Sequence, residues 1–348
     1  MRIPCLSLLL SGLIVLLASH VTVAQDRLGD PLPDGAVQRL GTLRLRGGIS
    51  DLCYLLDGRG VIAVGNRLDI WDLANGELQA TQKVCDAGIV SIALRSDGKA
   101  MLVADGSGNV HEWDLESQAV LHTFATDQSS LRSAHYSPDE KRVLTTGSSP
   151  PTIKEFELAT GNELVAITGK MHYFHEAIYG PEGKTALVNG GAGSDPILAH
   201  YDLSSGELLH EWHKDYYAHR KSLVLSEDRQ RVLAGTRHSA TEWQIADHAL
   251  LQKFSGHHGH AVTAVAYCKD PDQLLTGSRD GSIRRWDRLE NKVLLRWCPH
   301  EAYVTHIQVS PDGERVLEPG WRVLGGEART LVRQRRHWRA RRSRALVG

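Results

Sequence analysis

A unit of about 43 residues recurs along the chain, and this repeat limits the possible fold more than any other feature. Most units carry an aromatic residue, then an acidic residue, then an aliphatic one. The aromatic residues stand at intervals of 42, 43, 45, 42 and 43 residues: Trp71, Trp113, Phe156, Tyr201, Trp243 and Trp286. A second marker, a turn such as Ser310-Pro-Asp-Gly313, precedes the aromatic position and keeps the same phase. Repeats of this length are typical of solenoids, propellers and arrays.

Within each unit the sequence predicts four short strands and no helix. In the sixth unit, Val262–Tyr267 and Gln273–Thr276 have the composition of strands, and turn residues separate them. Arg279-Asp-Gly281 marks a tight turn into a third strand that ends near Trp286, and a polar bend leads to a fourth strand. One such sheet cannot bury both of its faces, whereas several sheets around an axis can. We therefore expect an all-β propeller.

Residues 39–317 resemble the WD40-repeat β-propellers, and the sixth unit carries the resemblance best. It contains Gly256-His257, Asp280-Gly281 and Trp286-Asp287. The resemblance implies a hydrogen-bonded chain of a His, a Ser or Thr, the turn Asp and the Trp, which we name the blade lock. The members of this lock would be His257, Thr276 or Ser278, Asp280 and Trp286.

Other units depart from this pattern. The position of His257 is taken by Cys85, Thr126 and Gly169 in the second, third and fourth units. We expect these blades to keep the shape, lose the polar lock and depend more on packing.

The number of blades follows from both ends of the repeat region. Six units are complete, and a seventh begins with Tyr303–Val309 and the turn that follows it. The resemblance implies that the strand-like segment Val37–Arg46 completes the seventh blade and closes the ring. Residues 25–38 form the expected linker. Residues 318–348 form an atypical Arg-rich tail. One interpretation is that truncation or a frame shift has replaced the native ending. The other is that the tail is a basic segment that binds an anionic surface.

The first 24 residues have the pattern of a secretory signal peptide. Arg2 precedes an apolar run from Ile3 to Ala18, and small residues stand at Thr22 and Ala24. We expect cleavage after Ala24 and a periplasmic, cell-envelope or secreted protein. The alternative is an uncleaved signal anchor, the one case in which we expect a membrane association. In an exported chain the remaining cysteines permit disulfides, although buried free thiols fit equally well: Cys53, Cys85, Cys268 and Cys298.

Composition and motifs exclude several classes of function. A net charge of −1 excludes a uniformly polyanion-binding chain, and we expect no nucleic-acid partner. Gly183-Lys-Thr185 resembles the end of a phosphate loop, but Ile178 stands where that loop requires Gly. The sequence contains no GxSxG nucleophile motif and no HExxH zinc motif. We therefore expect no enzyme activity, no catalytic residue, no cofactor and no metal.

The resemblance implies a monomeric, non-catalytic scaffold that binds other proteins, here outside the cytoplasm. Binding residues belong on loops, and the loops before each first strand are the candidate surface. The candidate anchors are His172, Tyr173, Phe174, Tyr216, Tyr217 and His258. Packing between blades is the alternative role for these aromatic residues. An alternative function is a small-molecule site in the central channel, among Asp51, Arg132, His135, His175 and His306 of the innermost strands.

Overall fold

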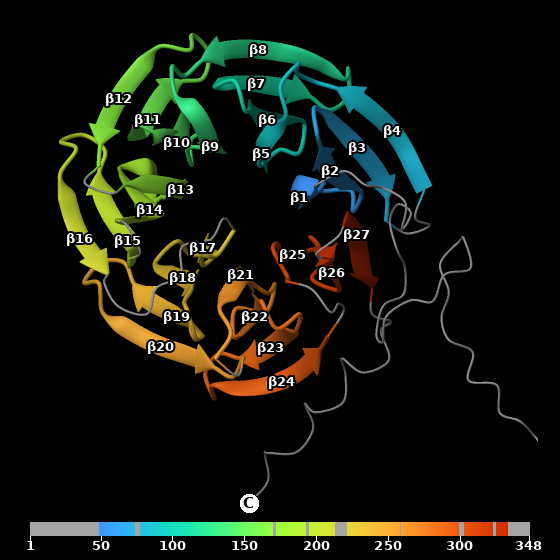
Figure 1. Cartoon of the computed structure of the whole chain (residues 1–348), viewed down its shortest axis with the longest axis vertical. Helices are drawn as coiled ribbons and strands as arrows, with labels where there is room; N and C mark the ends of the chain where they lie inside the picture. The colour runs from blue at the N-terminus through green and yellow to red at the C-terminus, as the bar shows by residue number, and fades with distance from the viewer. Residues whose placement is uncertain are drawn as a thin grey trace, which may run out of the picture.

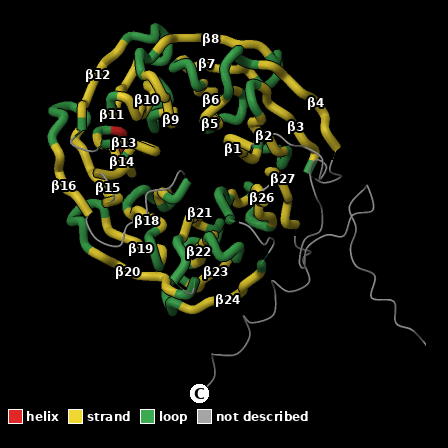
Figure 2. The backbone as a smooth tube through the Cα atoms, in the orientation of Figure 1, coloured by secondary structure: helices red, strands yellow, loops and turns green. Residues whose placement is uncertain are grey.

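The computed structural model describes residues 49–332, apart from 74–76, 170–171, 193–194, 213–220, 258, 299–302 and 323–324. Its strands form sheets that stand around a central axis like the blades of a propeller (Figure 1). Six sheets have four antiparallel strands each, in the order of the chain from the axis to the rim. Strands and loops make up nearly the whole described backbone (Figure 2), with a short 3-10 turn, η1 (Pro181–Gly183). The predicted all-β propeller is confirmed.

The strands of the first three blades follow the repeat. The first blade comprises β1 (Ile49–Tyr54), β2 (Gly60–Val64), β3 (Arg67–Asp72) and β4 (Glu77–Lys83). The second comprises β5 (Ile89–Leu94), β6 (Ala100–Asp105), β7 (Asn109–Asp114) and β8 (Ala119–Ala125). The third comprises β9 (Ser129–Tyr136), β10 (Arg142–Ser149), β11 (Pro151–Glu157) and β12 (Glu163–Thr168).

The next three blades repeat the same order. The fourth comprises β13 (Tyr173–Tyr179), β14 (Thr185–Ala192), β15 (Asp195–Asp202) and β16 (Leu208–Trp212). The fifth comprises β17 (Leu223–Leu225), β18 (Arg231–Gly235), β19 (Ser239–Gln244) and β20 (Leu250–Ser255). The sixth comprises β21 (Val262–Tyr267), β22 (Gln273–Ser278), β23 (Ile283–Asp287) and β24 (Lys292–Trp297).

A three-stranded sheet follows the sixth blade: β25 (Gln308–Val309), β26 (Arg315–Arg322) and β27 (Gly325–Val332). It lies against the first blade, where the backbone N–H of Tyr54 donates to Oε1 of Gln308 at 2.6 Å and Leu317 packs in one cluster with Leu52. Its strands run past residue 317, at which we expected the propeller to end. The closing segment Val37–Arg46, the signal peptide, the linker and residues 333–348 lie outside the described residues. Closure of a seventh blade by the N-terminal strand therefore stays a prediction.

Polar turns join the first and second strands of a blade, and their side chains explain the second sequence marker. In the third blade the hydroxyl of Ser137 donates to the carboxylate of Asp139 and accepts from the backbone N–H of Arg142 at 3.0 Å. The same two contacts recur at Ser226 and Ser310. A Ser and an Asp at this spacing replace backbone partners in the turn, which is why they repeat.

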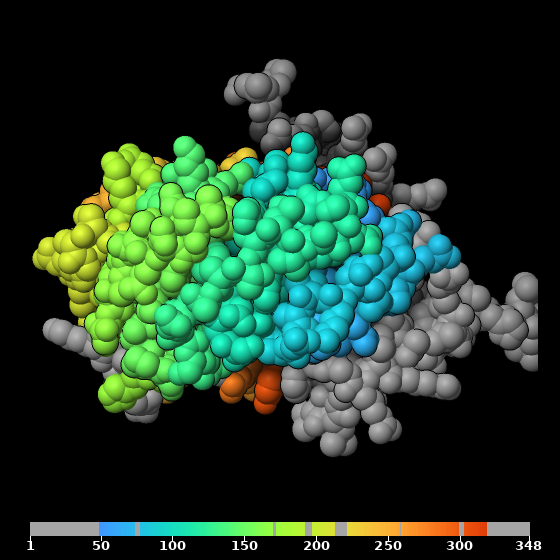
Figure 3. All heavy atoms as spheres, turned by 90° about the horizontal axis from the view of Figure 1, so that it is seen from above, coloured from blue at the N-terminus to red at the C-terminus, as the bar shows by residue number. Residues whose placement is uncertain are grey.

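Apolar side chains fill the space between neighbouring sheets. One buried cluster joins Leu144 and Ile153 of the third blade to Phe174 and Tyr201 of the fourth. Seen edge-on, the first four blades lie side by side around the rim, from blue to yellow (Figure 3). Each of these sheets buries its faces against its neighbours, as a propeller requires.

A hydrogen bond between a Tyr and a Glu crosses three of the blade interfaces, and we name these contacts the Tyr–Glu ties. The Tyr ends the first strand of one blade, and the Glu precedes the repeated aromatic position of the blade before it. The O–H to Oε1 distances are 3.2 Å for Tyr136–Glu112, 2.9 Å for Tyr179–Glu155 and 2.7 Å for Tyr267–Glu242. An Arg also pairs with each Glu: Arg95, Arg142 and Arg231. The carboxylates are buried, so these partners satisfy them.

The four cysteines among the described residues are free thiols: Cys53 and Cys85 are buried, Cys268 is half-buried and Cys298 is exposed. No helix in the described part of the chain is long and apolar enough to cross a membrane.

Candidate functional site

The blade lock of the sixth blade is a continuous hydrogen-bonded chain. The hydroxyl oxygen of Thr276 lies 2.7 Å from Nε2 of His257 and accepts from Nε1 of Trp286 at 2.8 Å. On the other side of the imidazole, Nδ1 of His257 lies 3.3 Å from Oδ1 of Asp280. Burial lowers the pKa of His257 to about 4, against the opposing effect of Asp280. The imidazole is therefore neutral at pH 7 and serves as a fixed hydrogen-bonding unit.

Two serines have different places in this lock. Ser278 accepts from the backbone N–H of Asp280 at 3.2 Å and does not replace Thr276. Ser282, which the sequence analysis did not include, lies 3.0 Å from Nδ1 of His257 and donates to Oδ1 of Asp280 at 2.6 Å. Its position directly after Asp280-Gly281 was the feature of the sequence from which its place in the lock could have been predicted.

The expectation that the second and third blades lose their polar lock is wrong, because other residues take over. In the third blade, Gln128 accepts from the Thr145 hydroxyl at 2.6 Å and donates to Thr152 Oγ1 at 2.9 Å. Thr145 and Thr152 stand in register with Thr276 and Ser282. The sequence reasoning missed Gln128 because it lies two residues beyond the position that aligns with His257. In the second blade a contact between Asp105 and His111 takes the place of the lock, with 3.1 Å between Oδ2 and Nε2.

The candidate partner-binding residues divide into three groups. His172 is exposed, and the ring of Tyr173, half-buried, lies 5.0 Å from that of His175. Phe174 is fully buried in the core, because side chains alternate along β13, so it is not part of a binding surface. Tyr216, Tyr217 and His258 lie outside the described residues.

Charged side chains from several blades meet at the axis of the ring. This axial cluster consists of Asp51 on β1, His135 on β9, Glu176 on β13, Lys221 just before β17 and His306 just before β25. The Lys221 ammonium lies 2.9 Å from Oδ2 of Asp51 and 3.7 Å from Oε1 of Glu176. The imidazole Nε2 of His135 lies 3.3 Å from Oε1 of Glu176, and that of His306 lies 3.9 Å from Oδ1 of Asp51.

Backbone groups complete the coordination of the two carboxylates. Asp51 accepts from the N–H of Leu52 at 2.8 Å and from that of Ile92 in the second blade at 2.9 Å. Glu176 accepts from the N–H of Lys221 at 3.0 Å. The axial cluster therefore connects blades that are not neighbours in the ring.

The electrostatics of the axial cluster keep both carboxylates ionised. Burial raises the pKa of Asp51, but Lys221 and then His306 outweigh it, and the pKa lies below its usual range. Burial likewise raises the pKa of Glu176, yet Lys221 and the nearby His135 lower it to about 2. With both carboxylates ionised and paired, the cluster connects the blades by charge. Two other residues considered for the channel are engaged elsewhere, Arg132 with Ser148 and His175 with Tyr173.

A basic and aromatic surface covers the loops of the fifth to seventh sheets. Because the strands are antiparallel, the loop before each first strand and the turn between the second and third strands lie at one end of the ring. There the Arg279 guanidinium stacks over the ring of Tyr303, 5.1 Å from its centroid, and Tyr303 is 48% exposed. Nδ1 of exposed His238 lies 3.1 Å from the carbonyl oxygen of Gly259. We name the exposed residues of these loops the basic loop face: Arg237, His238, His260, Arg279 and Tyr303.

Comparison with known proteins identifies the repeat. Residues 248–287, which hold the blade lock, match the model of the WD domain, G-beta repeat. The chain is similar to U3 small nucleolar RNA-associated protein 15 of Schizosaccharomyces pombe, with 22% identity over 72% of this chain and 50% of the relative. Autophagy-related protein 16 of Arabidopsis thaliana is 22% identical over 65% of this chain and 44% of its own length. Protein groucho of Drosophila melanogaster is 28% identical over 44% of this chain and 20% of its own length.

The chain spans about half or less of the length of these relatives. WD40 proteins are generally non-enzymatic scaffolds that bind protein partners. The matched repeat, the similarity over much of the chain and the ring of four-stranded sheets together show an all-β propeller of the WD40 type.

Proposed function

We propose that this protein is a non-catalytic scaffold outside the cytoplasm and that the basic loop face binds an acidic segment of a protein partner. The observation that carries the proposal is the stacked pair of Arg279 and Tyr303 on an exposed loop surface. Arg and Tyr are enriched among residues that dominate the energy of protein interfaces. The rigid ring beneath them keeps the loops in place without ordering costs at binding.

Charge supports an acidic partner. The basic loop face combines Arg237 and Arg279 with two exposed imidazoles, His238 and His260. Over the second and third blades, the same end of the ring instead exposes Asp86 and Asp127. A partner with carboxylates would be attracted to the first region and repelled by the second, which fixes its orientation.

The location outside the cytoplasm rests on the pattern of residues 1–24. Export would remove the signal peptide and leave Gln25 as the first residue. Mass spectrometry of the protein recovered after fractionation of the producing cells tests this part. A cytoplasmic protein that retains Met1 or begins at Arg2 would contradict it.

Binding is tested by affinity retention of cell proteins on the full chain, followed by chemical cross-linking and mass spectrometry. We expect a partner whose acidic segment cross-links near Tyr303, and whose retention falls at least tenfold in Arg279→Glu. The matched control is Lys184→Glu, which makes the same charge change in an exposed ion pair at the other end of the ring. Equal retention by both variants would contradict the proposed surface. Retention that disappears with salt in every variant alike would indicate the Arg-rich tail instead.

A further inference from the structure

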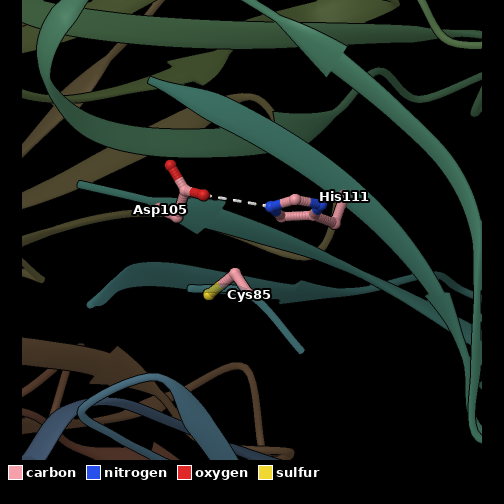
Figure 4. Close-up of side chains that lie close together, drawn as sticks. All are labelled: Cys85, Asp105 and His111. Atoms are coloured by element: carbon pink, nitrogen blue, oxygen red, sulfur yellow. Dashed lines mark hydrogen bonds and ion pairs between the residues drawn. The ribbon is translucent and has the colours of Figure 1, made fainter. Parts of the chain in front are cut away.

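Three unlike metal-binding side chains converge in the second blade, where the blade lock would stand. Cys85 lies in the loop between β4 and β5, Asp105 ends β6 and His111 lies on β7. A sulfur, a carboxylate oxygen and an imidazole nitrogen of these residues all lie within 4.8 Å of one another. Figure 4 shows Asp105 and His111 facing each other from separate strands, with Cys85 close by. All three are buried.

Replacement of the blade lock does not explain why residue 85 is a cysteine. Asp105 and His111 already form the polar contact, with 3.1 Å between Oδ2 and Nε2. The Cys85 thiol instead donates to the carbonyl oxygen of Ala87, at 3.1 Å. In the third blade the aligned residue is Thr126, whose hydroxyl donates to the carbonyl oxygen of Gly108 at 2.8 Å. A hydroxyl group is therefore sufficient for this hydrogen bond. The sulfur of Cys85 adds a possible metal-ligand atom beside the carboxylate oxygen of Asp105 and the imidazole nitrogen of His111.

Surrounding groups hold the other two side chains in the orientation that a metal ligand needs. Nδ1 of His111 lies 2.9 Å from the hydroxyl oxygen of Thr123, so Nε2 faces the cluster. Oδ1 of Asp105 accepts from the backbone N–H groups of Ser107 and Asn109, at 2.9 and 3.0 Å. The other oxygen, Oδ2, is the one that faces His111. Such contacts from outside the ligand set fix ligand geometry in metal sites.

We propose that Cys85, Asp105 and His111 bind one zinc ion through Sγ, Oδ2 and Nε2, with water in the fourth position. Zinc takes this mixture of sulfur, nitrogen and oxygen ligands, and bond lengths of about 2.0–2.3 Å place tetrahedral ligand atoms roughly 3–4 Å apart. As a ligand through Nε2, His111 carries its ring proton on Nδ1, which donates to the hydroxyl oxygen of Thr123. The thiol proton of Cys85 leaves to solvent, so binding releases one proton per metal ion.

The test is a titration of the folded full chain with ZnCl₂ by isothermal calorimetry in two buffers of different ionisation enthalpy, which also counts released protons. A parallel titration with CoCl₂ reports thiolate ligation by a sulfur-to-cobalt charge-transfer band. We expect one site, one released proton and the charge-transfer band. Cys85→Thr removes the sulfur and installs the residue type that the third blade accepts, so it should fold. We expect it to lose the band and at least 100-fold in zinc affinity.

Matched controls separate this site from adventitious binding. Cys298→Ser removes an exposed thiol and should leave affinity, stoichiometry and the cobalt band unchanged. Asp105→Ser installs the residue type of Ser278, which stands in register in the sixth blade, and should weaken zinc at least tenfold. The proposal is overturned if the folded wild type binds no zinc, if cobalt binds without the thiolate band, or if Cys85→Thr binds as tightly as wild type. The circular-dichroism spectrum of each variant establishes that it is folded.

Discussion

The ammonium nitrogen of Lys221, at the start of the fifth blade, lies 2.9 Å from Oδ2 of Asp51 in the first blade. The two blades are not neighbours, so this ion pair spans the axis of the ring. Asp51 is 1% exposed, and Lys221 also approaches the buried Glu176 of the fourth blade. A single lysine thus pairs with two buried carboxylates from different blades.

Replacing that lysine should be strongly destabilising. We expect Lys221→Met to lower the free energy of unfolding by about 3 kcal/mol, because a buried charge left without its partner costs several kcal/mol. Urea unfolding followed by tryptophan fluorescence measures it. Lys184→Met, which removes an exposed pair with Glu182, should leave the midpoint unchanged. Equal midpoints for the two variants would show that the axial cluster contributes nothing.

Low pH should lower the stability of the folded ring because Glu176 becomes protonated. Its pKa is about 2 in the folded protein and near 4.5 in the unfolded chain, so the unfolded state binds more protons between these values. The contribution to stability is present above pH 4.5 and is lost as the pH falls toward 2, by about 3 kcal/mol in total. Urea midpoints measured across this window should fall more steeply for wild type than for Glu176→Gln. Parallel curves would contradict this assignment.

The hydroxyl of Thr276 should contribute strongly to the free energy of unfolding, because two buried groups share it as a hydrogen-bond partner. Thr276→Val keeps the shape but leaves Nε2 of His257 and Nε1 of Trp286 without their shared partner. We expect a loss of about 2–4 kcal/mol, since each unsatisfied buried group costs about 1–3 kcal/mol. Thr276→Ser retains the hydroxyl and should recover most of that loss. If both variants unfold at the same temperature in calorimetry, packing rather than hydrogen bonding holds this blade.

Each Tyr–Glu tie should make a modest contribution to the free energy of unfolding. Tyr267→Phe removes the hydrogen bond to Glu242, which keeps Arg231 and Arg288 nearby at 3.6 and 3.5 Å. Because the carboxylate stays paired, we expect a cost of about 1–2 kcal/mol in chemical unfolding. Tyr303→Phe, at an exposed ring, is the control and should change nothing. A loss much larger than this would mean that the arginines depend on the tyrosine for their position.

The sequence predicts what repeats and misses what occurs once. The spacing of Trp71 to Trp286 determines the blades, because every unit must present the same strands and turns to its neighbours. The lock of the sixth blade could be assigned because it follows a known pattern. Gln128 could not, since it enters through side-chain contacts that depend on backbone register. Ser282 left one signal, its position directly after Asp280-Gly281.

The other contacts that the sequence did not predict join residues far apart along the chain. Asp51, His135 and His306 were noticed as charged residues of the innermost strands, but their partners Lys221 and Glu176 carry no spacing that links them. Cys85 and His111 likewise meet only because the fold brings the loop before β5 close to β7. The Tyr–Glu ties did leave a signal, a Glu before the aromatic position and a Tyr before the next turn, about 24 residues apart.

The axial cluster also sets the order in which this protein can be completed during synthesis. Asp51 leaves the ribosome with the first blade, whereas Lys221 follows only when four blades have been translated. Until then the nascent chain holds a carboxylate that cannot be buried without a counterion. A stack of independent repeats can fold from one end to the other. In this ring, by contrast, Asp51 gains its ion pair with Lys221 only when the fifth blade arrives.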